Sequence, residues 1–194
     1  FGGGMVWALG STAFVGDTVI RLDPTTETVT TFPASGSIGG LAYGFDALWL
    51  AMTAEGTLVR LDPATGETRV VATGLVSPRS VAVGSDSLWV TLHGGEVQAT
   101  PGDIQLVRID PADGKVLAEF EIGGSPQWGV DIWADDDGVL VRSTDPWLVR
   151  IDPATNEVQE PIVSEPAIQG PLTVAFGSIW TINIERDVVY RVAP

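Results

Sequence analysis

A tetrapeptide of the form Arg-Leu/Ile-Asp-Pro recurs along the chain at nearly constant spacing. Four copies begin at Arg21, Arg60, Arg108 and Arg150, and a degenerate copy, Arg191-Val192-Ala193-Pro194, ends the sequence. From arginine to arginine the steps are 39, 48, 42 and 41 residues. A repeat of about 40 residues that carries strand-like segments is typical of a β-propeller blade.

The third repeat shows the expected strands most clearly. Apolar segments at Ser80–Gly84, Leu88–Leu92, Leu106–Ile109 and Lys115–Ile122 are separated by turn residues. Four short strands divided by such residues predict a four-stranded antiparallel sheet. We therefore predict an all-β fold: a single β-propeller domain over residues 1–194 with about five four-stranded blades. The predicted repeats are approximately 1–39, 40–78, 79–127, 128–170 and 171–194.

The Asp-Pro pair of the tetrapeptide predicts a tight turn. The aspartate accepts backbone N–H bonds just downstream, and proline presets φ for the first turn position. A left-handed residue is expected three positions after the proline, and the copies place Glu27, Gly66, Gly114 and Asn156 there. These aspartates are thus turn residues and not catalytic carboxylates. The arginine is expected to stack on a neighbouring ring or to pair with a carboxylate.

Tryptophan occupies one position of the second strand in four of the five repeats. These residues are Trp7, Trp49, Trp89 and Trp180, and Leu140 is the exception. We predict that each ring fills the space between neighbouring blades, where two sheets leave room for a large side chain. The alternative is an aromatic binding cage.

The two ends of the sequence predict an incomplete ring. The last repeat offers three strands (172–176, 178–182 and 187–192), and Phe1-Gly2 aligns with Phe176-Gly177 at the end of an inner strand. We expect a fragment of a larger propeller, or one whose terminal blade is completed by a partner, with exposed strand edges at the terminal blades.

Composition excludes several classes of function. The formal charge of −15 makes nucleic-acid binding and docking on anionic lipid improbable. The sequence contains no run of 18 apolar residues that would predict a membrane span, so membrane insertion is not expected. The absence of cysteine rules out disulfides and thiol catalysis.

The repeat motif resembles a group of bacterial propeller repeats. The elements concerned are Leu88-Trp89-Val90, the run Leu106 to Gly114 with its Arg-Ile-Asp-Pro core, and Ser77-Pro78 before Val81-Ala82-Val83-Gly84. In these the chain resembles the YVTN, NHL and virginiamycin B lyase-like repeats. The resemblance implies a propeller that is an extracytoplasmic binding or scaffold domain, a sensor module or, less often, an enzyme. The lyase of this group uses a histidine, a glutamate and magnesium, but no stretch here matches that catalytic motif.

Candidate ligand-binding residues fall in the loops that lead into each blade and in those that join the second and third strands. Function on repeat scaffolds concentrates in such loops. Trp128 and Trp147 lie outside the repeating tryptophan position and are therefore candidates for stacking on a ligand. The remaining candidates on this loop face are Arg79, Gln127, Gln169 and His93.

An insertion after His93 lengthens the third repeat and supplies the weak candidates for catalysis. His93 is the only histidine, with Glu96 near it in sequence and Glu185 in a corresponding loop. Together they define an alternative function, a lyase or hydrolase. A solvent-facing polar role for His93 is the simpler interpretation.

The run Asp135-Asp136-Asp137 is a weak candidate for a metal site. Three carboxylates suit calcium or magnesium, although the spacing is not that of a calcium loop. A solvated hairpin tip is the alternative, and no cofactor is otherwise expected.

Taken together, these features favour a non-catalytic binding or interaction propeller. It would use the loop face around the central channel to bind a protein or a small molecule. We expect it to lie outside the cytoplasm, as an extracytoplasmic or secreted protein, or to be a module of a larger protein. A third alternative is a structural subunit of a cell-surface assembly that pairs through its propeller edges.

Overall fold

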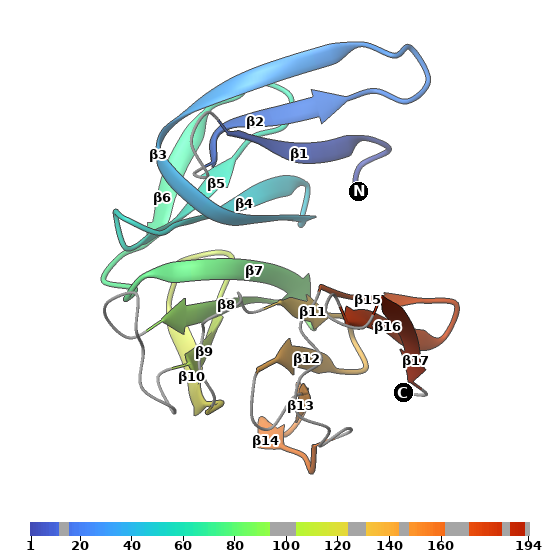
Figure 1. Cartoon of the computed structure of the whole chain (residues 1–194). Coiled ribbons are helices and arrows are strands. Elements are labelled where there is room, and N and C mark those ends of the chain that lie inside the picture. The colour runs from blue at the N-terminus through green and yellow to red at the C-terminus, as the bar shows by residue number, and fades with distance from the viewer. Residues whose placement is uncertain are drawn as a thin grey trace.

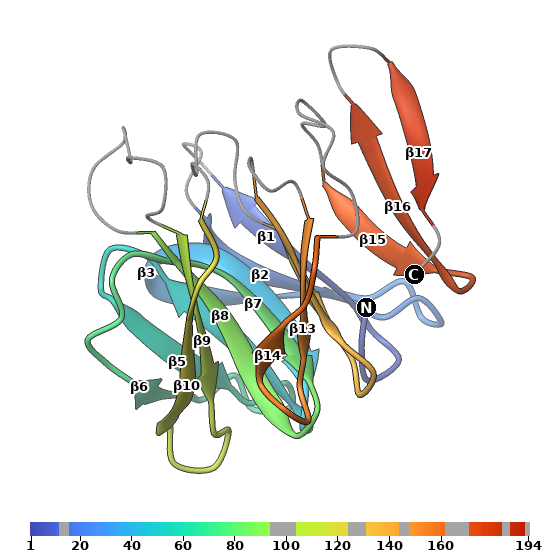
Figure 2. The same ribbon diagram turned by 90° about the horizontal axis from the view of Figure 1, so that it is seen from below.

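The structure is a computed structural model that describes seven stretches of the chain: residues 1–11, 16–93, 104–123, 131–143, 148–161, 171–183 and 187–192. Within them the regular elements are all β-strands, and no helix is present that could cross a membrane. The strands form antiparallel sheets arranged side by side around a common centre (Figures 1 and 2). The all-β propeller predicted from the repeat is confirmed.

Five blades, numbered I to V, follow one another along the chain, and each runs from an inner strand outward. Blade I contains β1 (Val6–Ser11), β2 (Gly16–Leu22) and the first part of β3 (Val29–Gly44). Blade II contains the rest of β3, β4 (Ala47–Met52), β5 (Thr57–Leu61) and β6 (Thr68–Ala72), and blade III contains β7 (Pro78–Gly84), β8 (Ser87–His93), β9 (Ile104–Ile109) and β10 (Val116–Glu121). Blade IV contains β11 (Ile132–Ala134), β12 (Val139–Arg142), β13 (Leu148–Asp152) and β14 (Glu157–Val158), and blade V contains β15 (Leu172–Ala175), β16 (Ser178–Asn183) and β17 (Val188–Val192).

One strand belongs to two blades. The first part of β3 pairs with β2 in blade I, and its last part pairs with β4 in blade II. Blades I and II therefore form one six-stranded sheet, whereas III and IV are separate four-stranded sheets. Figure 1 shows β3 curving from one blade into the next. The predicted repeat boundary at 39/40 falls inside this strand.

The hydrophobic core lies between the blades. In β4 and β8 every residue is buried, because blades II and III each have a neighbour on both faces. The outer strands β6 and β10 are largely exposed. This explains why the second strands are continuous apolar runs, whereas the outer strands are mixed in polarity.

The repeating tryptophans fill the joints between blades, as predicted. Trp7 packs among residues of blade II, Trp49 among residues of blade III and Trp89 among residues of blade IV. Each indole N–H also donates to the carbonyl of the residue five positions earlier: Gly2, Gly44, Gly84 and, for Trp180, Ala175. Each ring is thus fixed to its own hairpin, and the rings of Trp7, Trp49 and Trp89 also contact the next blade.

The Asp-Pro turns have the predicted geometry. The Asp62 carboxylate accepts hydrogen bonds from the backbone N–H groups of Ala64 and Thr65. Asp23 and Asp152 accept the same two bonds in their turns, and Asp110 accepts the first of them, from Ala112. Such bonds, foremost from Thr65 to Asp62 and from Thr25 to Asp23, lower the pKa of these two carboxyl groups below the ordinary value. The expected left-handed conformation occurs in all four copies, at Glu27, Gly66, Gly114 and Asn156.

The arginine of the tetrapeptide connects one blade to the next. The predicted stacking is present: the guanidinium groups of Arg21, Arg108 and Arg191 lie over Phe32, Trp89 and Trp180. The polar partner differs from the predicted carboxylate, because Arg21 donates to the Pro63 carbonyl and Arg108 to the Pro153 carbonyl. Each acceptor is the proline of the tetrapeptide in the following blade, so this motif joins blades as well as shaping turns.

Glycines allow the inner strands to approach one another closely. A Cβ on Gly40 of β3 would lie 2.6 Å from the Arg79 carbonyl oxygen of β7, and one on Gly84 of β7 would lie 2.7 Å from the Asp135 nitrogen. Any larger residue would force these backbones apart near the centre of the propeller.

Blades I and V are not hydrogen-bonded to each other within the described stretches. β1 and β17 each lie at the edge of a sheet with a strand neighbour on one side. Exposed edges were expected at the terminal blades, and these strands have that position.

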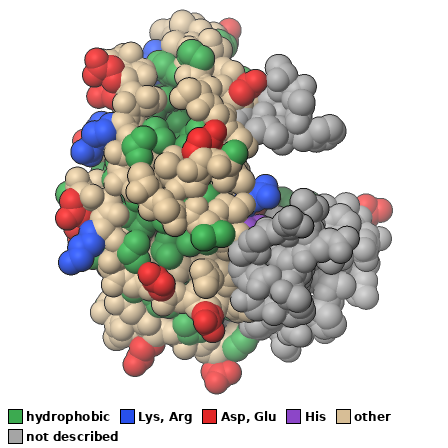
Figure 3. All heavy atoms as spheres, turned by 90° about the vertical axis from the view of Figure 1, so that its left-hand side faces the viewer, with side chains coloured by type: hydrophobic (Ala, Val, Ile, Leu, Met, Phe, Trp, Pro, Cys, Tyr) green, Lys and Arg blue, Asp and Glu red, His purple; other side chains and the backbone are tan. Residues whose placement is uncertain are grey.

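The acidic side chains do not form one patch on the face seen in Figure 3. In the described part of this face they are scattered among apolar, uncharged and basic side chains.

Candidate functional site

The candidate residues fall at opposite ends of the strands. His93 ends β8, whereas Ser85, just before β8, bonds to the hairpin of Asp135 and Asp136 in blade IV. Because β8 separates the two positions, the loop-face candidates and the aspartate run cannot form one site.

His93 is a strand residue and not the solvent-facing loop residue expected from the sequence. It pairs with Ile104 at the end of the β8–β9 ladder and is 6% exposed. The ladder extends beyond the predicted strand ends, which draws the imidazole into the structure. Its backbone N–H donates to the Ser77 carbonyl, and its Nε2 atom is buried without a hydrogen-bond partner.

The protonation of His93 follows from this position. Burial, with a smaller contribution from the charge of Arg79, lowers the pKa of His93 to about 4. At neutral pH the imidazole is therefore uncharged. The Arg79 side chain is exposed at the start of β7. The structure thus brings two of the predicted loop-face residues together, a neutral imidazole and an exposed guanidinium.

The other loop-face candidates lie outside the described residues. These are Glu96, Gln127, Trp128, Trp147, Gln169 and Glu185. Their roles in ligand binding or catalysis stay predictions.

An ion pair at the same end of the blades was missed from the sequence. The buried side chain of Arg142, at the end of β12, contacts Asp131 with an Nε–Oδ2 distance of 3.4 Å. The Asp131 carboxylate also accepts from the backbone N–H of Leu172 in blade V. The signal in the sequence for this ion pair was Arg142 itself, a charged residue at a position where the second strands of blades II and III carry Ala51 and Thr91.

The three carboxylates of the aspartate run do not converge on one point. Asp135 accepts hydrogen bonds from the backbone N–H groups of Asp137 and Gly138, and Asp136 accepts from that of Ser85. Among the described residues no group of three or more potential ligands has the geometry for a metal ion. The run forms a hairpin tip that contacts Ser85 of blade III, and metal binding by its carboxylates stays a prediction.

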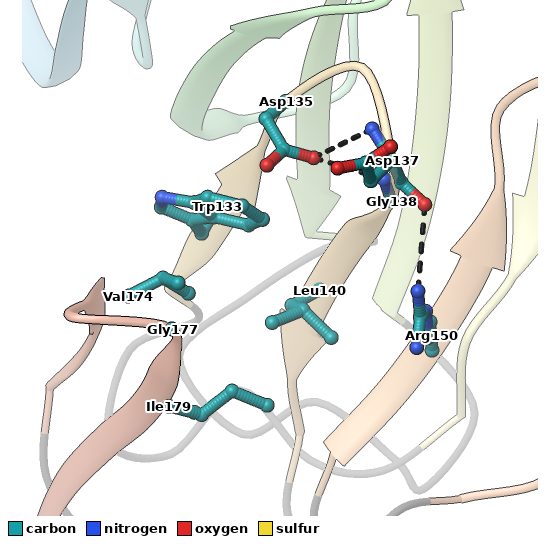
Figure 4. Close-up of a pocket in the computed structure, with 9 residues that line it drawn as sticks. All are labelled: Trp133, Asp135, Asp137, Gly138, Leu140, Arg150, Val174, Gly177 and Ile179. Atoms are coloured by element: carbon teal, nitrogen blue, oxygen red, sulfur yellow. Dashed lines mark hydrogen bonds between the residues drawn. The ribbon is translucent and has the colours of Figure 1, made fainter. Parts of the chain in front are cut away.

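A cavity of about 550 Å³ lies between blades IV and V, on the side of the aspartate hairpin. Figure 4 shows the residues that line it: Trp133, Asp135, Asp137, Gly138, Leu140 and Arg150 from blade IV, and Val174, Gly177 and Ile179 from blade V. Of these lining residues, Asp135, Asp137 and Arg150 carry charged side chains, and the others are glycine, aliphatic or aromatic. Of the ligand-binding candidates that lie within the described stretches, Arg79 and His93, neither lines it.

Comparisons with known proteins identify the fold and not a family. No protein-family model matches the chain, and neither does any curated protein. Among solved structures, BamB from Moraxella catarrhalis is similar with a TM-score of 0.64 and 17% identity, over 97% of this chain and 54% of BamB. The computationally designed Ika4 protein is similar with a TM-score of 0.61 and 12% identity, over 82% of this chain and 93% of Ika4. The chain thus spans about half the length of BamB.

Proposed function

We propose that this protein is a non-catalytic binding propeller that recognises a protein or a small molecule at the loop face. The observation that carries the proposal is that His93 and Arg79 lie near each other on the neighbouring strands β8 and β7. Leaving the buried Nε2 atom of His93 without a hydrogen-bond partner is costly, so a ligand whose binding opens this end of blade III and supplies a partner is favoured. The exposed Arg79 guanidinium next to it suits a carboxylate or another planar anion.

The same residues favour binding over catalysis. A general base works best when its pKa is close to the operating pH, whereas the pKa of His93 is about 4. An imidazole in this state is a weak base at neutral pH. The lyase or hydrolase alternative, with Glu96 and Glu185, would require a large change in the surroundings of His93.

Charge reversal at the two ends of the strands tests the proposal. Arg79→Glu alters the loop face, and Glu157→Lys makes a matched change at an exposed position near the Asp-Pro turns. The partner is isolated from extracts of the source cells on the immobilised wild-type protein, identified, and titrated against both variants. We expect at least tenfold weaker binding for Arg79→Glu only, since a hydrogen-bonded charge contributes more than about 1.4 kcal/mol. Loss with Glu157→Lys alone would contradict the loop face as the binding site.

The expected location outside the cytoplasm is part of this proposal. Fractionation of the source cells, followed by detection of the protein with an antibody, tests it. Recovery in the cytoplasmic fraction alone would contradict it.

A structural subunit is the second candidate, favoured by the edge strands β1 and β17. In the described stretches each has a strand neighbour on one side, and such edges pair readily with other chains. The solution mass from light scattering decides this point. Assembly that persists at micromolar concentration supports edge pairing, and a monomer opposes it.

A further inference from the structure

The joint between blades IV and V lacks the tryptophan that fills the other joints. Trp49 and Trp89 are 1% and 0% exposed, because the following blade covers them. Leu140 stands at the corresponding position of β12. A leucine is much smaller than an indole, so the same spacing between sheets leaves unfilled volume.

A second substitution shows that the indole has moved rather than disappeared. Trp133 of β11 lies opposite Leu140, whereas Ala42 and Ala82 lie opposite Trp49 and Trp89. Blade IV thus carries its large ring one strand closer to the propeller centre. Trp133 packs there with Leu140, Leu148 and Ile179, and the space farther out stays open. This space is the cavity of about 550 Å³, within the range of small-molecule sites.

Arg150 lacks the stacking ring and the serine hydroxyl that its counterpart Arg108 contacts. Arg108 stacks on Trp89 and donates from Nε to the Ser87 hydroxyl. In blade IV the ring is Leu140, and Gly138 replaces the serine. A Cβ on Gly138 would lie 3.2 Å from the Arg150 Nε atom. The hydrogen bond described for Arg150 is a long one, 3.4 Å, to the Asp137 carbonyl.

The far wall of the cavity is apolar and belongs to blade V. Val174 and Ile179 correspond in register to Ala134 and Val139, which pack against Trp89 at the preceding joint. In Figure 4 Leu140 lies between Trp133 and Arg150, with Val174 and Ile179 across the cavity. The cavity thus has the surroundings of an indole site without its indole.

We infer that this cavity binds a planar aromatic heterocycle with a ring N–H, of the indole type. The ring packs between Leu140 and Ile179 with the Arg150 guanidinium over its face. Its N–H donates to the Asp135 carbonyl, which corresponds to the Gly44 and Gly84 carbonyls that accept from Trp49 and Trp89. That carbonyl already accepts from the Ser85 hydroxyl and has a second lone pair.

Charge among the lining residues narrows the class of ligand. Asp135 and Asp137 are among the residues that line the cavity. They disfavour an anionic substituent and tolerate a neutral or amino-bearing one. The site lies at the opposite end of the strands from His93, so it is independent of the loop face.

Indole itself is the probe for the first experiment. It is titrated into wild-type protein with ¹³C-labelled methyl groups, and nuclear Overhauser effects locate it. We expect saturable binding with contacts from the ring to the methyls of Leu140, Val174 and Ile179. 1-Methylindole, which cannot donate to Asp135, should bind about fivefold more weakly.

Filling the cavity from within the protein is the second experiment. Leu140→Trp should abolish indole binding, whereas Leu117→Trp, at an exposed position of β10, should leave it unchanged. If Leu140→Trp fails to fold, the contacts in the wild-type protein and the comparison with 1-methylindole decide alone. The inference is overturned by lack of saturation, by contacts elsewhere, by equal affinity for 1-methylindole, or by undiminished binding to a folded Leu140→Trp variant.

Discussion

The guanidinium of Arg108 in blade III donates a hydrogen bond of 2.7 Å to the carbonyl oxygen of Pro153 in blade IV. Arg21 and Pro63 repeat this relationship at 2.6 Å between blades I and II. In both cases the same tetrapeptide supplies donor and acceptor, so the copy in blade I is bonded to that in blade II and the copy in blade III to that in blade IV. The repeat is therefore a connector in which the third strand of one blade recognises the turn of its neighbour.

Replacing Arg108 by lysine should weaken the protein although the charge is kept. Lysine has no planar group to stack on Trp89. Its single ammonium group also cannot donate to Ser87, Pro153 and Asn156 at the same time. We expect the free energy of unfolding, measured in urea, to fall by about 2 kcal/mol. Arg69→Lys, at an exposed position of β6, is the control and should change it by less than about 0.5 kcal/mol. Equal losses in the two variants would refute the connector role.

The contribution of a repeating tryptophan to the free energy of unfolding should depend on whether a neighbouring blade covers its ring. Trp89→Leu should cost about 3 kcal/mol, because it opens a space next to blade IV. Trp180 makes the same N–H bond, to Ala175, but is only half-buried, so Trp180→Leu should cost about 1 kcal/mol. Thermal unfolding by calorimetry measures both. The prediction is wrong if the Trp180 variant is as unstable as the Trp89 variant.

Stability should fall between about pH 6.5 and pH 4 because of His93. Its pKa in the folded protein is about 4, whereas the unfolded chain binds the proton near pH 6.5. In this window the unfolded state holds more protons, so acid favours unfolding, by up to about 3 kcal/mol. His93→Asn removes the contribution, and the difference between the two proteins should be constant above pH 7. A folded-state NMR titration of His93 with a midpoint near 6.5 would argue against its burial.

Glu27 offers a site for stabilisation. It adopts φ of +57°, which costs a non-glycine residue about 1 kcal/mol or more, whereas Gly66 and Gly114 serve the same position elsewhere. Glu27→Gly should raise the free energy of unfolding by about 0.5 kcal/mol, net of the added freedom of the unfolded chain. Glu67→Gly, one residue after the left-handed position of the next turn, should lower it. Urea titrations of both variants test whether the opposite signs hold.

The sequence predicted those features that depend on local chemistry repeated several times. The Asp-Pro turns, their left-handed residues and the wedging tryptophans follow from residue type and spacing, and the structure confirms them. The arginine partner was predicted only in part. A carboxylate is the usual partner of a guanidinium, but the geometry between blades presents a proline carbonyl instead.

The remaining features depend on contacts between distant segments. Burial of His93 requires two more ladder pairs, up to Ile104, than the apolar pattern suggested. The cavity near Arg150 follows from two substitutions considered jointly, Trp133 on one strand and Leu140 on the next. Leu140 was noted as an exception, but its meaning depends on what lies across the joint, and this is visible only in three dimensions.

The continuous strand β3 has a consequence for how the molecule comes apart. The other neighbouring blades contact each other through side-chain packing and individual hydrogen bonds, whereas blades I and II share one continuous strand from Val29 to Gly44. Ile38 pairs with both β2 and β4, and the backbone on either side of it is one continuous strand, so the two blades should unfold as one cooperative unit. In native-state hydrogen exchange, amides of blades I and II would then exchange together, whereas those of blades IV and V could open separately.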